Sequence, residues 1–258
     1  MNKIADAFRR NYLLYCIEAW GLGAFMISAS LFTILFQHPN LKLVHLIPSD
    51  LLRRFLIGVA MGVTAMGIIY SAWGRKSGSQ INPSVTVTML LLKKISLPDA
   101  LFYMLFQVAG GTLGVCLVAA VLPAYISHPS VNYVVTIPGK EGVLAAALGE
   151  SIISFLMMFI TLVTSNSMNK TIQRLTGLVT GLLICSFVTF EAPYSGFSMN
   201  PARTIASAVP SHIWVAWPLY MLVPPLAMLS AALAYNALVH QGKFKSLKHY
   251  LTPKGGVS

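Results

Sequence analysis

Two copies of one short sequence contain the residues whose types and spacing predict chemistry. Residues 77–84 read SGSQINPS and residues 195–202 read SGFSMNPA, so both fit the pattern S-G-x-x-[IM]-N-P-[SA]. Asparagine is a good helix N-cap, and a proline is tolerated in the first turn because its missing N–H would have no partner there. A single Asn-Pro pair is usually an ordinary turn or cap. Two copies in matching context instead predict two related helices, capped by Asn82 and Asn200.

Each Asn-Pro pair opens an apolar run that is too short to cross a membrane. These runs, residues 84–92 and 202–209, suit half-helices that start at Pro83 and Pro201. Non-helical backbone at membrane depth is tolerated only where it is buried in protein or lines a water-filled cavity, so two such segments imply a pore. Two helix N-termini that meet near the midplane would place partial positive charge at its centre, which repels cations.

The composition predicts the long elements that must hold these half-helices. The 258 residues are 56% hydrophobic and only 10% charged, with a mean hydropathy of +0.71, whereas a soluble domain has about 25% charged residues. A helix needs about 20 residues to cross a bilayer. Six apolar stretches are candidate spans, of which the fifth is short: residues 12–36, 55–73, 101–122, 142–164, 175–190 and 213–238. We therefore expect an all-α membrane protein with six transmembrane helices and two re-entrant half-helices, forming one domain over residues 1–258.

The two halves of the chain, residues 12–122 and 142–238, each hold three spans and one Asn-Pro copy. Three spans per half give the second copy the opposite orientation in the membrane, which predicts an inverted 3+3 repeat. The first span of each half also contains one glutamate, Glu18 or Glu150. An intramembrane carboxylate indicates a function such as a proton relay by default. A structural role is the alternative.

The formal net charge of +11 is distributed as in a membrane protein, which argues against nucleic-acid binding. With both termini in the cytoplasm, most lysines and arginines fall on the cytoplasmic side, as the positive-inside rule predicts. They are Lys3, Arg9, Arg10, Arg75, Lys76, Lys93, Lys94, Lys170, Arg174, Lys243, Lys245, Lys248 and Lys254. The three cysteines and six histidines show no spacing typical of a metal site or a disulfide framework.

The chain resembles the aquaporin, or major intrinsic protein, family over essentially its full length. Two segments match the family signatures, the first with serine in place of alanine: Asn82-Pro83-Ser84 and Asn200-Pro201-Ala202-Arg203. The resemblance implies a passive channel for water and small uncharged solutes such as glycerol, which excludes ions and protons. It implies no enzyme activity and no cofactor, and a homotetramer with one pore per subunit. The exchange of alanine for serine would add a hydroxyl near the constriction.

The resemblance also implies a selectivity filter. Family spacing assigns Arg203 and Phe197 to it, together with Val188 from the fifth span and Gly62 from the second. Glycerol-conducting members have an aromatic at the Phe197 position, and strict water channels commonly have histidine at the Val188 position. This filter would therefore be less polar and wider than that of a strict water channel.

The second-span assignment leaves alternatives open. A slip of one residue would substitute Met61 for Gly62, and Gly58-x-x-x-Gly62 is equally a motif for helix crossing. For Glu18 and Glu150, the resemblance implies that each accepts hydrogen bonds from the backbone of a re-entrant loop.

Three further questions stay open at the level of sequence. A facilitator for glycerol, urea or a metalloid hydroxide is an alternative to a water channel, and an ion-coupled secondary transporter is a remote one, because transporters also use inverted repeats with broken helices. Glu191 matches no family role and is either a loop anchor or a vestibule charge. The short termini and the absence of an organelle signal predict a bacterial-type cytoplasmic membrane and a bacterial member of the family.

Overall fold

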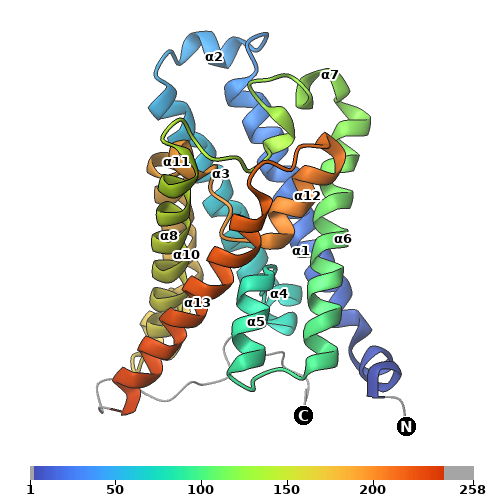
Figure 1. Cartoon of the computed structure of the whole chain (residues 1–258), viewed down its shortest axis with the longest axis vertical. Coiled ribbons are helices and arrows are strands. Elements are labelled where there is room, and N and C mark those ends of the chain that lie inside the picture. Colours follow the sequence, from blue (N-terminus) through green and yellow to red (C-terminus); the bar gives the residue numbers. More distant parts are fainter. Residues whose placement is uncertain (1–2, 241–258) are drawn as a thin grey trace.

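The computed structural model describes residues 3–240, and every regular element in that range is a helix (Figure 1). In chain order the elements are α1 (Lys3–Gln37), α2 (Lys42–Leu46), α3 (Asp50–Tyr70), α4 (Ala72–Ser77), α5 (Pro83–Leu91), α6 (Leu97–Val121), α7 (Pro123–Ile126), the 3-10 helix η1 (Asn132–Val134), α8 (Gly142–Ser165), α9 (Lys170–Arg174), α10 (Thr176–Phe190), α11 (Ala192–Ser195), α12 (Pro201–Ser211) and α13 (Trp217–His240).

Six of these helices match the six predicted spans. By length and composition, α1, α3, α6, α8 and α13 can each cross a membrane, whereas α10 is apolar but has only 15 residues. The prediction that the fifth span is short is therefore confirmed. Large apolar side chains such as Leu105, Leu113 and Leu144 stay exposed on these helices, as expected where lipid tails are as apolar as leucine. The arrangement is that of a multi-pass membrane protein.

The second span ends earlier than the predicted residue 73. Helix α3 ends at Tyr70, and the hydroxyl of Ser71 accepts a hydrogen bond from Gly74 N at 2.8 Å, which caps a separate helix, α4. At the end of α4, Gly78 has a φ of 94°, a left-handed conformation that glycine adopts without a steric penalty. The short helix α4 thus connects the second span to the loop that carries the first Asn-Pro pair.

The two half-helices are α5 and α12, and they lie in opposite halves of the molecule. Figure 1 shows α5 in the lower half and α12 in the upper half. Each packs against the last long helix of the other repeat, since α5 contacts α13 and α12 contacts α6. The predicted starts at Pro83 and Pro201 agree with the structure. This exchange of half-helices ties the two repeats together.

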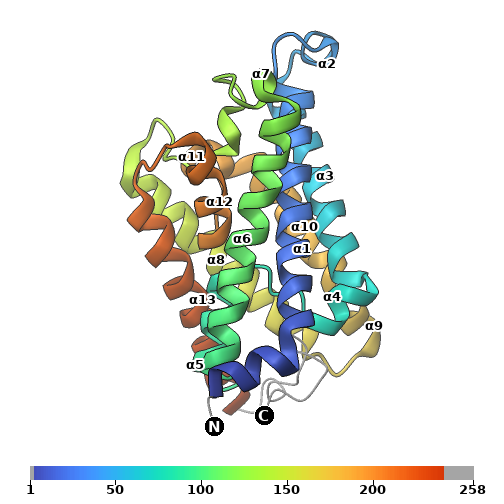
Figure 2. The same ribbon diagram turned by 90° about the vertical axis from the view of Figure 1, so that its right-hand side faces the viewer.

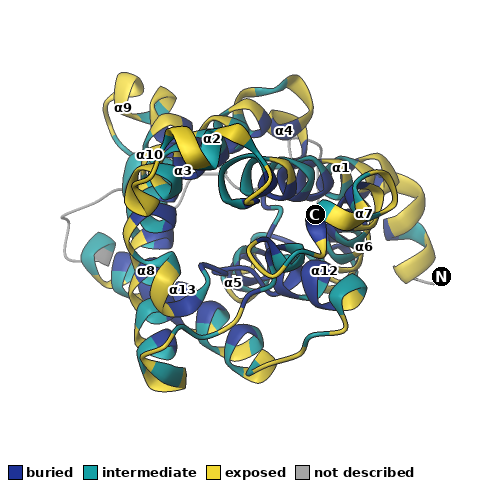
Figure 3. Ribbon diagram, turned by 90° about the horizontal axis from the view of Figure 1, so that it is seen from above, coloured by how far each residue is buried: buried dark blue, intermediate teal, exposed yellow. Residues whose placement is uncertain are grey.

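The long helices surround the half-helices in a ring. Helices α1 and α6 lie side by side (Figure 2), and the equivalent pair in the second half is α8 and α13. Across the two halves, α3 packs against α10. Viewed from above, exposed residues lie mainly on the outer rim of the ring (Figure 3). The helix pairs therefore follow the two-fold relation that an inverted repeat predicts.

Candidate functional site

The two asparagines of the repeat meet at the centre of the molecule. Asn82 Nδ2 donates a hydrogen bond to the carbonyl oxygen of Met199 at 2.9 Å, and Asn200 Nδ2 donates to the carbonyl oxygen of Ile81 at 2.8 Å. Each asparagine therefore bonds the residue that precedes the other. The N-terminal ends of α5 and α12 are held against each other by this reciprocal pair.

The other side-chain atom of each asparagine caps its own half-helix. Asn82 Oδ1 accepts from Ser84 N at 2.8 Å, and Asn200 Oδ1 accepts from Ala202 N at 3.0 Å and from Arg203 N at 3.2 Å. The backbone N–H groups at a helix start have no partner within the helix, so these caps satisfy groups that would otherwise be unpaired. The capping role predicted for both asparagines is present in the structure.

Glu18 binds the backbone of the first re-entrant loop. Its carboxylate accepts hydrogen bonds from Gln80 N at 3.1 Å and from Ile81 N, and from the side chain of Gln107 at 2.8 Å. The residue is 0% exposed. Because the carbonyl of the same Ile81 accepts the bond from Asn200, Glu18 positions one of the two central acceptors.

Glu150 does the same for the second loop. Its carboxylate accepts from Ser198 N at 2.6 Å, from Met199 N at 2.7 Å and from the Ser195 hydroxyl at 2.8 Å. It is also 0% exposed. The hydrogen bonds described for both carboxylates are accepted from fixed donors. This is the geometry of structural support and does not resemble a chain of proton-relay groups.

These carboxylates hold backbone that would otherwise be unfavourable. Ile81 has a φ of 37° and Met199 a φ of 52°, and both residues precede an Asn-Pro pair. Positive φ is uncommon for non-glycine residues and persists where surrounding contacts impose it. In this conformation the N–H of each residue is bound by the glutamate while its carbonyl is bound by the opposite asparagine.

One cavity of about 620 Å³ runs past this centre. Arg75 and Arg174 line it at one end, Phe197 and Arg203 at the other, and both asparagines in between. Its ends thus come from elements in the lower and upper halves of Figure 1. The cavity extends on both sides of the two half-helix N-termini, as a pore would.

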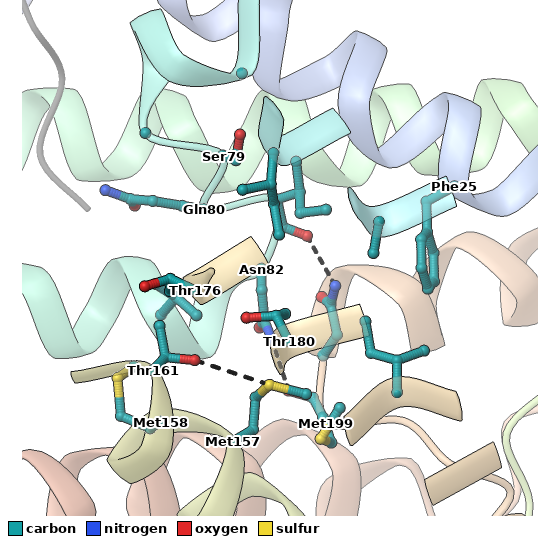
Figure 4. Close-up of a pocket in the computed structure, with 18 of the residues that line it drawn as sticks. Phe25, Ser79, Gln80, Asn82, Met157, Met158, Thr161, Thr176, Thr180 and Met199 are labelled. Atoms are coloured by element: carbon teal, nitrogen blue, oxygen red, sulfur yellow. Dashed lines mark hydrogen bonds between the residues drawn. The ribbon is translucent and has the colours of Figure 1, made fainter. Parts of the chain in front are cut away.

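The wall of the cavity combines thioether, aromatic and hydroxyl groups (Figure 4). Its labelled members include three methionines, three threonines and one phenylalanine: Met157, Met158, Met199, Thr161, Thr176, Thr180 and Phe25. Thioether and aromatic groups offer no strong hydrogen-bond partner, so a solute would bind the hydroxyl groups, the asparagines, the loop backbone and the arginines at the two ends. Sequence reasoning did not assign these wall residues, because methionines and threonines in apolar helices give no signal that separates a wall from ordinary packing.

Arg203 is held by a residue that sequence analysis missed. Its guanidinium Nη1 donates to the hydroxyl oxygen of Thr136, which lies between η1 and α8. The Thr204 hydroxyl also donates to Thr136 Oγ1, at 3.3 Å, and contacts Ser198 Oγ at 2.6 Å. The arginine therefore lines the cavity with one side fixed to the loop wall. Nothing in the sequence around Thr136 marked it.

Gly62 lies at a helix crossing, outside the set of residues that line the cavity. A methyl group added to it would stand 2.4 Å from the carbonyl oxygen of Gly181 in α10, and one added to Gly58 would stand 2.6 Å from that of Cys185. Small residues allow two helix backbones to approach this closely. The contacts thus match the crossing alternative, and Met61, which is buried and hydrogen-bonded by Ser28, does not line the cavity either.

The same pairing places Val188 at a different level from Gly62. One helical turn before Gly58 in α3, Arg54 Nε donates a hydrogen bond to the carbonyl oxygen of Thr189 in α10 at 3.3 Å. Val188, which is 8% exposed, therefore lies level with residues 54–58 of α3, and of these Ile57 has a buried side chain.

Ser84 does not place its hydroxyl in the cavity. The residue is 0% exposed, it is absent from the cavity wall, and its Oγ has no hydrogen-bond partner within residues 3–240. The expectation that Ser84 adds a hydroxyl near the constriction is therefore wrong. Ser84 is the second residue of α5, and its side chain points into the packed side of the half-helix. Pro83, Pro201 and Ala202 are likewise buried beside the cavity.

Comparisons with known proteins agree with this geometry. The family model described as Major intrinsic protein matches residues 19–235. The chain is 33% identical to aquaporin NIP2-2 of Zea mays over 178 residues, which are 69% of this chain and 58% of the maize protein. It is 31% identical to the probable aquaporin AqpM of Archaeoglobus fulgidus over 193 residues, 72% of this chain and 77% of that protein. The matched part thus spans less than two thirds of the maize relative.

A solved structure has the same fold. The aquaglyceroporin from Plasmodium falciparum superposes with a TM-score of 0.70 at 20% sequence identity, covering 88% of this chain and 94% of the other. At this identity the likeness concerns the fold alone.

Proposed function

The chain belongs to the major intrinsic protein family, and on this premise we propose that it is a passive channel for water and small uncharged solutes that excludes ions and protons. The family is one of channels and not of enzymes. One observation supports the proposal most strongly: a single cavity of about 620 Å³ passes the paired half-helix N-termini and is lined by Asn82 and Asn200.

Exclusion of cations follows from the electrostatics of the centre. The N-termini of α5 and α12 carry partial positive charge, which disfavours a cation between them. The amide groups of the two asparagines present the polar atoms that water and hydroxyl groups can contact there. Arg203 adds a full positive charge at the upper end of the cavity. A neutral solute meets no comparable barrier.

We assign the selectivity filter to Arg203, Phe197 and Val188, as family spacing predicts, and we place Ile57 in it as an alternative to Gly62 from the second span. Arg203 and Phe197 line the cavity, whereas Val188 and Ile57 are buried outside the set of residues that line it. Ile57 is supported by its buried side chain and by its level opposite Val188 in the α3–α10 pairing. Three apolar side chains and one guanidinium would make a filter that binds water weakly.

A second candidate is a facilitator for glycerol, urea or a metalloid hydroxide with little selectivity for water. The apolar character of Ile184 and Phe197 in the cavity wall favours it, because such a wall lowers the cost for solutes with apolar faces. An ion-coupled transporter is disfavoured, since both intramembrane glutamates are bound to loop backbone and lie outside the cavity wall.

We also propose an orientation in the membrane, a type of membrane and an oligomeric state for the channel. The positions of the lysines and arginines favour a cytoplasmic location for the lower end of Figure 1, where α1 begins, and an outer location for the Arg203 end. We expect a bacterial-type cytoplasmic membrane. A homotetramer with one pore in each subunit is the assembly that family membership favours, and water and neutral solutes are its partners.

Stopped-flow light scattering on proteoliposomes tests the solute range. Osmotic water efflux is compared with glycerol and urea uptake at equal protein density. Fast water flow with slow solute uptake supports a water channel, and fast uptake of either solute supports the facilitator. A well-folded protein that passes none of the three would contradict both candidates.

A further inference from the structure

Glu191 is a buried acid that the proposed mechanism does not use. It follows the last residue of α10, and neither of its carboxylate oxygens has a hydrogen-bond partner within residues 3–240, although both are shielded from solvent. A methyl group added to Gly149 of α8 would stand 2.4 Å from Glu191 Oε1, so the carboxyl group lies directly against that backbone. A space-filling residue at this place would not need a carboxyl group, and leaving one buried without partners is costly.

The charged neighbours of Glu191 belong to the filter region. Glu150 of α8 follows Gly149, Arg203 of α12 lines the cavity, and the hydroxyl of Tyr220 in α13 is a third titratable group, on which the charge of Glu191 acts. Glu191 itself is not part of the cavity wall, whereas Arg203 is, and the carboxyl group lies against Gly149 of α8 at the end of α10. An ionised Glu191 therefore attracts the guanidinium toward a group that lies outside the cavity wall.

The proton affinity of Glu191 suits a change of charge near neutral pH. Burial raises the pKa of Glu191 to about 7, while the Ser195 hydroxyl and the positive charge of Arg203 act in the lowering direction and the charge of Glu150 raises it further. The group lies just beyond the end of α10, next to the outer mouth under the orientation proposed above. The group is therefore closer to the outer face of the membrane than to the cytoplasmic face.

We propose that Glu191 is a proton-binding residue of the outer pore, whose ionised form draws Arg203 toward α8 and α10 and widens the passage. Protonation removes this attraction, so Arg203 returns to its bond with Thr136 and narrows the passage. Permeability then rises with outer pH. The inference rests on the proposed channel function and adds a residue that sets its conductance.

The test compares the wild type with Glu191→Gln and with Glu141→Gln, a matched control on an exposed acid of the same end of the molecule. Solute and water permeability are measured in proteoliposomes from about pH 5.5 to about pH 8.5, a range that brackets the titration of a group with a pKa near neutrality. The permeability of the wild type and of Glu141→Gln should rise about twofold or more with increasing pH, with a midpoint near pH 7, as expected when a single group controls the pore. Glu191→Gln should stay at the low-pH value of the wild type.

A second readout does not depend on conduction. Infrared difference spectra over the same pH range should show a protonated carboxyl band that disappears near neutral pH in the wild type and in Glu141→Gln, and that is absent in Glu191→Gln. Absence of this band in the wild type, or a pH profile that survives in Glu191→Gln, overturns the inference. Flux that does not depend on pH contradicts the inference alone, whereas no flux at any pH also contradicts the proposed function.

Discussion

Asn82 and Met199 belong to opposite halves of the chain, yet only 2.9 Å separates the amide nitrogen of the first from the carbonyl oxygen of the second. The same Met199 donates its N–H to Glu150 at 2.7 Å. A buried carboxylate in one long helix thus fixes the backbone that receives the asparagine of the other repeat. The centre of the pore is therefore built by three residues that are far apart in the sequence.

Replacing this carboxylate should loosen the second loop. Glu150→Gln turns one acceptor oxygen into an N–H₂ donor that faces the Met199 or Ser198 N–H, so at least one charge-assisted hydrogen bond is lost, at a cost of about 1.5–3 kcal/mol. We expect a lower melting temperature in detergent and a lower water permeability. Glu141→Gln, on an exposed acid, should change neither quantity. An unchanged melting temperature for Glu150→Gln would contradict the supporting role.

The positive charge at the centre can be tested with a nearly isosteric change. Asn200→Asp keeps the oxygen that caps α12 but adds a negative charge between the two half-helix N-termini, which should lower the barrier to cations. We expect a cation leak in liposomes that the wild type lacks. Asn169→Asp is the matched control, because Asn169 caps the exposed helix α9 through the same type of bond to Thr171 N. If both variants exclude cations equally, the electrostatic barrier lies elsewhere.

Two substitutions separate the assignments of the second span. Gly62→Ala would bring a methyl group to 2.4 Å from a backbone oxygen of α10 and should destabilise the protein by about 1–3 kcal/mol. Gly67→Ala, in the same helix, meets nothing within 4 Å and should not. Ile57→Ala should raise glycerol uptake relative to water flow, since it widens the proposed filter.

One outcome would contradict the placement of Gly62 at the helix crossing. If Gly62→Ala is as stable as the wild type and changes solute selectivity, Gly62 belongs to the filter and not to the crossing of α3 and α10.

Phe197 should limit the size of solutes. It lines the cavity beside Arg203 and is 7% exposed, so Phe197→Ala removes a ring from the narrow end. We expect urea and glycerol uptake to rise about tenfold, the effect of roughly 1.4 kcal/mol on the barrier. Phe190→Ala, at a position that is 67% exposed on the outer surface, should leave uptake unchanged. Uptake that is unaffected by Phe197→Ala would remove this residue from the filter.

Glu191 predicts a pH dependence of stability that is separate from its effect on flux. Its pKa is raised to about 7 from an ordinary value of 4.5, so the native state binds the proton more tightly than the unfolded state does. The stability should therefore be highest below about pH 4.5 and should fall as the pH rises toward 7, by an amount on the order of 3 kcal/mol. Glu191→Gln, which cannot ionise, should melt higher than the wild type at about pH 8 and equally at acidic pH. Equal melting temperatures at alkaline pH would contradict the burial of an unpaired carboxylate.

The residues of this site differ in how far the sequence predicts them. Asn82, Asn200 and Arg203 were identified because the repeated motif places them at helix starts, and a cap or a pore-facing charge follows from local chemistry. Gly62 was assigned by counting, whereas its close approach to the carbonyl oxygen of Gly181 depends on how α3 packs on α10, which no local pattern revealed. Thr136 contacts Arg203 from 67 residues away, and no periodicity relates them.

The long helices were predicted more reliably than the contacts between them. Hydrophobic runs define a span by its length alone, whereas the meeting of Met199 with Asn82 depends on two loops with positive φ held by glutamates. The hydroxyl of Ser84 shows the same limit, because its direction depends on how α5 packs and not on the motif around it.

The central claim is that the cavity between α5 and α12 is a passive pore that conducts water and excludes protons. The most direct test measures osmotic water efflux and proton leak in the same proteoliposomes, by light scattering and by an internal pH dye. We predict that the protein accelerates water efflux well above that of empty liposomes while the proton leak stays at their level. A proton leak that rises together with water flow, or water flow no faster than through lipid alone, would contradict the account.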